Sequence, residues 1–248
     1  MKPKTIEEIK YMRHGGKILG KILKILQNES KPGISENELN QISEELCREH
    51  NVKPAFLRYK GYPKSLCISI NDKVVHGIPS SYTIKDGDVV SLDYGVIYKG
   101  LYTDAAISFI VGDNKDQKIQ SFLDVVKQSR DEGIKAAKNM SFVGDISYAM
   151  EGPVKKAGYS IVKELSGHGI GYKLHEDPYI LGYGKPKTGM QLRKNMTVAI
   201  ESMINMGRSD IYIERDGWTI RTQDQSLSGH FEHTILITDG AAEILTLG

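Results

Sequence analysis

The order of the periodic segments along the chain is the feature that most restricts its fold. Two segments with helical spacing of apolar residues, 5–26 and 35–50, precede a β-rich region from Ser65 to Val111. Helical periodicity returns over 116–138 and 145–158, and short β-rich runs follow. The order of two helices followed by a sheet therefore occurs twice along the chain, which is compatible with a loose twofold repeat. Because no linker separates the halves, we expect residues 1–248 to form a single domain.

Local signals indicate where the helices begin and where they are disturbed. Thr5–Glu8 and Ser35–Glu38 have the spacing of capping boxes. Gly15–Gly16 interrupts the first helix at about 1 kcal/mol per glycine relative to alanine, so it either allows close packing or binding or is a tolerated surface feature. Pro153 should kink or shorten the helix over 145–158. The predicted strands are 66–70, 89–94, 102–111, 159–165, 196–205, 211–214 and 231–237.

Composition excludes several classes of protein. With 248 residues, 40% hydrophobic and 26% charged, the chain is typical of folded globular proteins. A net charge of +2 argues against a stable DNA-binding protein, although a lysine face at 10, 17, 21 and 24 leaves weak ribosome contact open beside a simply solvated face. Cys47 and Cys67 form no CxxC pair, and no apolar stretch approaches a membrane span of about 20 residues. We expect a cytoplasmic protein without membrane association.

Four acidic residues lie inside apolar β-like runs, where acids are disfavoured. They are Asp93, Asp104, Glu201 and Glu232. Burying an unpaired carboxylate costs several kcal/mol unless another group compensates, so these positions are candidates for function.

The first two acids suit a hairpin. If Asp93 and Asp104 are directly opposed, the turn is centred between Tyr98 and Lys99, with Gly100 available for irregular backbone. Opposed Cβ atoms lie about 4.5–5.5 Å apart, close enough for two carboxylates to hold metal ions about 3.5–4 Å apart. Taken as an isolated pair, one acid could instead start a turn or pair with Lys99.

A glycine-rich segment around His168 supplies a nitrogen donor. One imidazole and four carboxylates carry a charge of about −4, which two divalent cations would neutralise. Without metal, converging carboxylates would raise each other's pKa values. An oxygen-rich donor set without thiolate favours Mn, Fe, Co or Mg over a structural zinc site.

The chain resembles the type I methionine aminopeptidases over nearly its whole length, through an ordered series of motifs. These are Gly61–Asn71, His76–Pro79, Asp86–Gly95, Tyr102–Asp104, Gly167–Gly171, His175–Pro178, Glu201, Asp216–Thr219 and Phe231–Thr234. The resemblance implies an α+β pita-bread fold, with pseudo-twofold halves and a curved antiparallel sheet covered by helices. It also implies hydrolytic removal of the initiator methionine from nascent chains with a small second residue. The short N-terminus points to the bacterial type.

The resemblance assigns roles to individual side chains. The implied ligands of two divalent ions (Co, Mn, Fe or Zn) are Asp93, Asp104, His168, Glu201 and Glu232, with Asp104 and Glu232 bridging. Glu201 would accept the proton of the attacking water. His175 would bind the substrate carbonyl oxygen, and His76 would contact the scissile amide nitrogen. The implied methionine pocket is lined by Tyr59, Tyr62, Cys67, Leu174 and Trp218. Each aromatic, taken alone, is equally well explained by core packing.

Several positions depart from the family pattern. They are His230 in place of glutamine, Leu174 in place of an aromatic residue, Ser166 in place of cysteine, and Lys73 near a monovalent-cation site that Asn71 and Ser228 only partly match. Two alternative functions remain open. One is an Xaa-Pro peptidase of the same fold, which generally carries an extra N-terminal domain for which this chain has no room. The other is a metal-free peptide-binding module. We expect a monomer whose partners are polypeptide N-termini.

Overall fold

The computed structural model describes residues 2–113 and 116–248 and contains four α-helices in these ranges. The helices are α1 (Ile6–Glu29), α2 (Glu36–Glu49), α3 (Gln117–Ala136) and α4 (Val143–Ala157), with a 3-10 turn, η1, at Tyr59–Gly61. The strands are β1 (Lys53–Pro54), β2 (Cys67–Ile70), β3 (Lys73–Val75), β4 (Val89–Tyr98), β5 (Leu101–Ile110), β6 (Ser160–Ile161), β7 (Ser166–Gly169), β8 (Glu176–Leu181), β9 (Thr197–Asn205), β10 (Ile211–Ile213), β11 (Ile220–Thr222), β12 (Ser228–Leu236) and β13 (Glu243–Ile244). None of the helices in this part of the chain is long and apolar enough to cross a bilayer.

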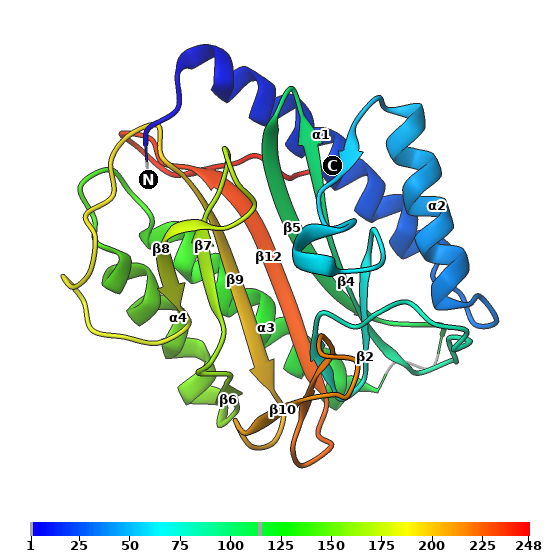
Figure 1. Ribbon diagram of the computed structural model, residues 1–248. Coiled ribbons are helices and arrows are strands. Elements are labelled where there is room, and N and C mark those ends of the chain that lie inside the picture. Colours follow the sequence, from blue (N-terminus) through cyan, green and yellow to red (C-terminus); the bar gives the residue numbers. More distant parts are fainter. Residues whose placement is uncertain (1, 114–115) are drawn as a thin grey trace.

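One twisted antiparallel sheet forms the centre of the molecule. Its strand order is β1-β4-β5-β12-β9-β7-β8, with β2 on β4, β6 on β9 and β13 on β12. A second, small sheet has the order β10-β11-β3. In Figure 1 the helices lie behind the long strands β4, β5, β12 and β9, which leaves the opposite face of the sheet toward the viewer. The predicted α+β class is confirmed.

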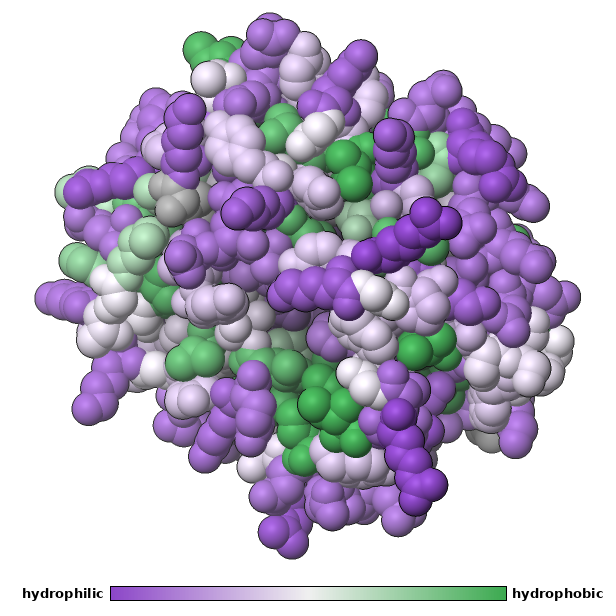
Figure 2. Space-filling view, in the orientation of Figure 1, coloured by the Kyte–Doolittle hydropathy of each residue, from purple (hydrophilic) through white to green (hydrophobic). Residues whose placement is uncertain are grey.

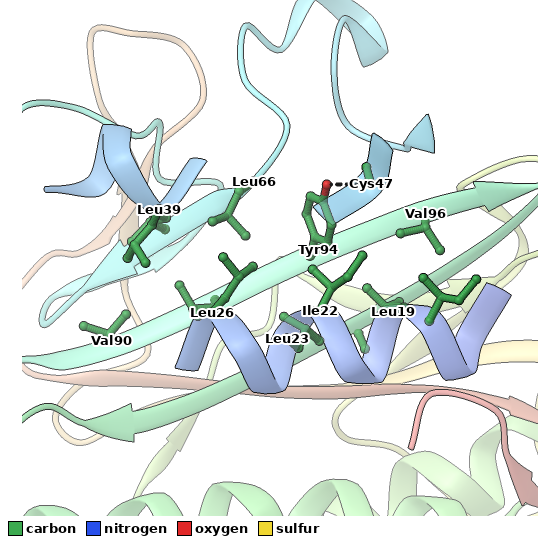
Figure 3. Packing of buried hydrophobic residues seen from close by; sticks show 14 of the residues in the cluster. Leu19, Ile22, Leu23, Leu26, Leu39, Cys47, Leu66, Val90, Tyr94 and Val96 are labelled. Atoms are coloured by element: carbon green, nitrogen blue, oxygen red, sulfur yellow. Dashed lines mark hydrogen bonds between the residues drawn. The ribbon is translucent and has the colours of Figure 1, made fainter. Parts of the chain in front are cut away.

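The two halves repeat one arrangement, a helix pair against a strand pair. Helices α1 and α2 pack on β4 and β5, and α3 and α4 pack on β9 and β12. In the first half, side chains at alternate positions of β4 point toward the helices, as Val90, Tyr94 and Val96 do beside the leucines of α1 in Figure 3. The intervening positions of β4, Asp93 among them, therefore lie on the face that the helices leave uncovered.

The helix signals mostly correspond to the structure. Both capping boxes are present, at the N-termini of α1 and α2. Pro153 lies inside α4, which continues to Ala157, so of the two predicted effects, a kink or a shortening, the shortening does not occur. The glycines of α1 allow close packing: a Cβ on Gly16 would lie 2.3 Å from the Leu245 carbonyl oxygen, and one on Gly20 would lie 2.4 Å from the Gly248 nitrogen. The C-terminal segment fills the groove that these glycines leave.

The hairpin register differs from the prediction. Asp93 pairs with Ala106 and Asp104 pairs with Gly95, so the two acids are diagonal neighbours. The turn consists of Lys99 and Gly100, which have φ angles of 51° and 81°. Positive φ at both central residues suits a two-residue turn whose twist matches the flanking strands. The observed partner of Asp93, Ala106, lies two residues along β5 from the predicted partner Asp104. Because side chains alternate between faces with a period of two, a shift of two residues leaves both carboxylates on the same face of the sheet.

The region between α4 and β9 departs most from the predicted strands. The expected strand over 159–165 is reduced to β6, because Val162 and its successors leave the ladder after two residues. The strands β7 and β8 follow where none was predicted. Glycine-rich and charged segments of this kind carry no clear period-two signal, so only the pairing of β7 with β9 and of β8 with β7 makes them strands.

Candidate active site

The sheet register places the five candidate ligands in two rows that run across the strands. The first row joins successive Cα partners on five adjacent strands: Glu201 on β9, Glu232 on β12, Ala106 on β5, Asp93 on β4 and Cys67 on β2. Ala106 projects only a methyl group between the carboxylates of its neighbours. The centre of this row therefore has room for a ligand between opposing acids.

A second row lies two residues further along the strands. His168 on β7 pairs with Ala199 on β9, which in turn pairs with Thr234 on β12. Asp104 on β5 is joined to Thr234 by two hydrogen bonds, since its N–H donates to Thr234 Oγ1 and that hydroxyl donates back to the Asp104 carbonyl, both at 2.8 Å. The five candidate ligands thus occupy two adjacent rows on the uncovered face.

A cavity of about 300 Å³ opens over these rows. Every predicted catalytic, pocket and ligand residue lines it: Tyr59, Tyr62, Cys67, His76, Asp93, Asp104, His168, Leu174, His175, Glu201, Trp218 and Glu232. On the face of the molecule shown in Figure 2, hydrophobic residues gather in the lower half among largely hydrophilic neighbours. The cavity combines acidic walls with an apolar end, so it suits a ligand that has a polar group and an apolar side chain.

The donor atoms lie at distances that suit metal ions. His168 Nε2 is 3.6 Å from Glu201 Oε1 and 4.0 Å from Glu232 Oε1. His168 Nδ1 lies 2.9 Å from the Gly169 carbonyl oxygen. Because a carbonyl oxygen only accepts hydrogen bonds, Nδ1 carries the hydrogen in this contact. The lone pair of Nε2 is then free to bind a metal ion. Two sets of three residues each have donor atoms that all lie within 4.8 Å of one another. One set is Asp104, His168 and Glu232, and the other is Glu201, His230 and Glu232.

The electrostatics of the cluster call for a cation. Burial and neighbouring acids raise the pKa values of Asp93 and Glu232 well above the usual range and that of Asp104 to about 7. Burial acts in the same direction on Glu201, but the adjacent His230 and His168 imidazoles outweigh it and lower the pKa of that carboxyl. Asp93 Oδ1 and Glu232 Oε1 are buried without a hydrogen-bond partner. These residues therefore fit divalent cations, which would satisfy the unpaired oxygens.

Two further histidines border the cluster without joining either donor group. Burial lowers the pKa values of His76 and His175 to about 4, so both are neutral at neutral pH. His175 Nδ1 lies 2.8 Å from the Tyr59 hydroxyl, and its ring lies 4.3 Å from that of His168. His76 has a φ of 58°, a conformation uncommon outside glycine and often associated with functional sites.

The predicted pocket residues form one apolar cluster at the end of the cavity. Tyr62 is buried and packs edge-on against Trp218, with 5.2 Å between ring centroids. The Tyr62 hydroxyl donates to the carbonyls of Leu66 and Gly77, which leaves its ring free to line the cavity. Burial raises the pKa of the Cys67 thiol, so this side chain acts as a small apolar group rather than a nucleophile.

Some lining residues had no predicted role. They are Phe56, Lys60, Val75, Glu164, Leu165, Ser166, Tyr179, Met203 and His230. Met203 and His230 could have been assigned to the cavity by strand alternation, because each lies two residues from a predicted ligand on the same strand. The others lie on loops and short strands that have no usable periodicity. Asn71 and Lys73 are not among the lining residues, and Lys73 Nζ lies 3.2 Å from Glu36 Oε1.

The antiparallel sheet, its helix-covered halves and the buried acid cluster define a metal-dependent hydrolase of the pita-bread class. A model of metallopeptidase family M24 matches residues 10–239, and the chain belongs to this family. Divalent metal dependence follows from membership of the family.

Within the family, this chain is most informatively compared with aminopeptidases that act on methionine. It is 43% identical to the methionine aminopeptidase of Clostridium perfringens over 98% of both chains. The methionine aminopeptidase of Rickettsia prowazekii superposes with a TM-score of 0.97 and 40% identity over the full length of both chains. The prolidase of Pyrococcus furiosus gives a TM-score of 0.75 and 25% identity, and the match spans 98% of this chain but 65% of the prolidase.

Proposed function

We propose that this protein is a methionine aminopeptidase that removes the N-terminal methionine from polypeptides whose second residue is small. The observation that carries this proposal is the juxtaposition, in one cavity, of the acid and imidazole cluster with an apolar pocket. An exopeptidase for methionine needs both features, a centre that attacks the first peptide bond and a closed pocket for one thioether side chain. The similarity to methionine aminopeptidases over nearly the whole chain supports the same activity.

The centre that we propose holds two divalent ions, drawn from Co, Mn, Fe and Zn. Its ligands are Asp93, Asp104, His168, Glu201 and Glu232. This set is supported by the two adjacent rows, by the unpaired oxygens of Asp93 and Glu232, and by the free Nε2 of His168. When bound, two such ions lower the pKa of water and polarise the scissile carbonyl.

Glu201 is the proposed general base. Its carboxyl pKa is lowered by the His230 and His168 imidazoles, so it is ionised at neutral pH, whereas burial raises the pKa values of Asp93 and Glu232. An ionised carboxylate at the edge of the cluster can take up the proton that water loses on attack. The same carboxyl can then return that proton to the departing amine.

His76 and His175 are the proposed substrate contacts. Both are neutral, so each can donate one ring hydrogen to substrate. In the orientation that the sequence implies, His175 stabilises the carbonyl oxygen as negative charge develops, and His76 contacts the amide nitrogen. The methionine side chain then lies against Tyr59, Tyr62, Cys67, Leu174 and Trp218, where sulfur–aromatic contacts contribute about 0.3–1.5 kcal/mol each.

The remaining features of the proposal concern the whole protein. We propose a single catalytic domain over residues 1–248 that acts as a monomer in the cytoplasm on nascent chains, with weak ribosome contact through the lysine face of α1. The continuous ten-stranded sheet supports the single domain. Sedimentation with ribosomes at low and high salt tests the contact, because an electrostatic interaction would be lost at high salt.

Peptide hydrolysis distinguishes the candidate functions. The protein is freed of metal, reloaded with Co or Mn, and assayed on Met-Ala-Ser, Met-Leu-Ser and an Xaa-Pro peptide, with metal content measured in parallel. We expect cleavage of Met-Ala-Ser only, since a small second residue leaves the cavity unobstructed. Preference for the Xaa-Pro peptide would support the prolidase alternative. Binding of peptides without any cleavage by metal-loaded protein would support a binding module.

A further inference from the structure

The cavity contains a second imidazole, that of His230, which lies near the same two carboxylates as the proposed ligand His168. His230 Nε2 lies 3.2 Å from Glu201 Oε2 and 4.0 Å from Glu232 Oε2. The corresponding distances from His168 Nε2 are 3.6 and 4.0 Å, to the other oxygen of each carboxylate. Both carboxylates therefore lie between two imidazoles and present one oxygen to each of them.

The environment of His230 indicates an unused donor atom. The side chain is 2% exposed, and Nε2 is buried without a hydrogen-bond partner in spite of its proximity to Glu201. A buried polar atom without a partner is rare in folded proteins and calls for a ligand. Two donor atoms bound to one ion at about 2.0–2.2 Å lie about 2.8–3.6 Å apart, so the contact with Glu201 already has the required spacing.

We infer that His230 is an additional metal ligand beside the five proposed above, and that it binds one of the two ions together with Glu201 and Glu232. This inference rests on the proposed dinuclear function and extends it. The centre then has two imidazoles for two ions, where the set implied by the sequence provides only one. Nitrogen donors favour Fe, Co and Zn over Mn and Mg, so the second imidazole directs the site toward later transition metals.

X-ray absorption of the wild-type protein loaded with two equivalents of Zn tests the inference without any substitution. Imidazole rings give a distinct scattering pattern that can be counted per ion. We expect about one imidazole per zinc ion on average, because two rings are shared by two ions. A count of about half an imidazole per ion would overturn the inference.

A titration with matched variants provides the second test. Metal-free wild-type, His230→Gln and His233→Gln proteins are titrated calorimetrically with Zn and with Mn. His233 lies on the same strand but on the opposite face, where its Nδ1 contacts Thr246 Oγ1 at 2.8 Å. We expect His230→Gln to weaken one of the two zinc-binding steps at least about tenfold and manganese binding less, and we expect His233→Gln to bind both metals as wild type does.

The outcomes separate this inference from the proposed function. If His230→Gln binds zinc as wild type does, His230 only neighbours Glu201 and the inference is wrong, whereas cleavage of Met-Ala-Ser by wild type would still support the function. Two imidazoles in a protein that cleaves no methionyl peptide would support the ligand assignment and contradict the function. A wild-type protein that binds no divalent ion would overturn both. Circular dichroism of the metal-free variants checks their folding.

Discussion

At the scale of single residues, the two histidines that flank the acid cluster, His76 and His175, differ from the acids in carrying no charge at neutral pH. His76 and His175 are buried beside the carboxylates of the cluster, and burial lowers their pKa values to about 4 in spite of the nearby Glu201. Protonated imidazoles would compete with cations for the same carboxylates. Because they stay neutral, they can lie beside a metal centre and address the substrate.

His76 provides the prediction at this scale. We expect His76→Ala to lower turnover of Met-Ala-Ser at least about tenfold while metal content stays unchanged, because the ring contacts substrate and belongs to neither donor group. Turnover and bound metal are measured on the same samples. His14→Ala is the control, since His14 lies on α1 against Tyr98, outside the cavity. Near-normal turnover of the His76 variant would remove it from the catalytic residues.

At the scale of elements, α1 does more than cover the sheet. The first turn of α1 and the residue Lys4 before it hold the loop that carries His175. The Tyr172 hydroxyl donates to Glu8 Oε2 at 2.9 Å, and the Nζ of buried Lys4 lies 4.3 Å from the centroid of the Tyr172 ring. Glu176 accepts hydrogen bonds from two backbone N–H groups of this loop. The capping carboxylate of α1 thus also fixes one wall of the cavity.

The glycines of α1 give the prediction at the element scale. We expect Gly16→Ala to lower the free energy of unfolding by about 1–3 kcal/mol, because the new methyl group would overlap the Leu245 carbonyl and force the C-terminal segment outward. Lys17→Ala on the same helix is the control: Lys17 is exposed, so its replacement should change the free energy of unfolding by less than about 0.5 kcal/mol. Urea unfolding measures both, and a Gly16 variant as stable as wild type would contradict the packing.

At the scale of the whole molecule, the site exists because the two halves meet. Strands β4 and β5 come from the first half and β9 and β12 from the second, and β5 pairs with β12 to join them. Each half contributes two carboxylates, and His168 is added from β7 beside β9. The cluster therefore forms only when the whole sheet has assembled, so metal binding should stabilise the complete fold.

The acid cluster predicts how metal and pH act together. In metal-free protein, Asp104 has a pKa of about 7, above the ordinary aspartate value. The folded state therefore binds more protons than the unfolded state between these two pKa values. This extra proton binding stabilises the folded state at low pH, and the stabilisation is lost as pH rises toward 7. Metal competes with those protons. Saturating metal should thus raise the unfolding temperature more at about pH 7.5 than at about pH 5.5 and contribute about 2.7 kcal/mol at a hundredfold excess over Kd.

Scanning calorimetry with and without metal at both pH values measures this difference. Asp104→Asn serves as the comparison, since it removes one carboxylate and should reduce the stabilisation by metal. Equal shifts in unfolding temperature at the two pH values would show that the carboxylates are already ionised without metal.

The amino-acid sequence by itself determined the helix pairs, the long strands and the identity of the candidate ligands. Capping boxes and alternating apolar residues are local signals, and an acid inside an apolar strand is conspicuous without any knowledge of contacts. Only the tertiary structure decided which residues face one another. It set the diagonal register of Asp93 and Asp104 through the Lys99–Gly100 turn, formed β7 by pairing with β9 and β8 by pairing with β7, and brought His230 to within 3.2 Å of Glu201. Register and the pairing of distant strands depend on turn geometry and on long-range packing, which no local pattern encodes.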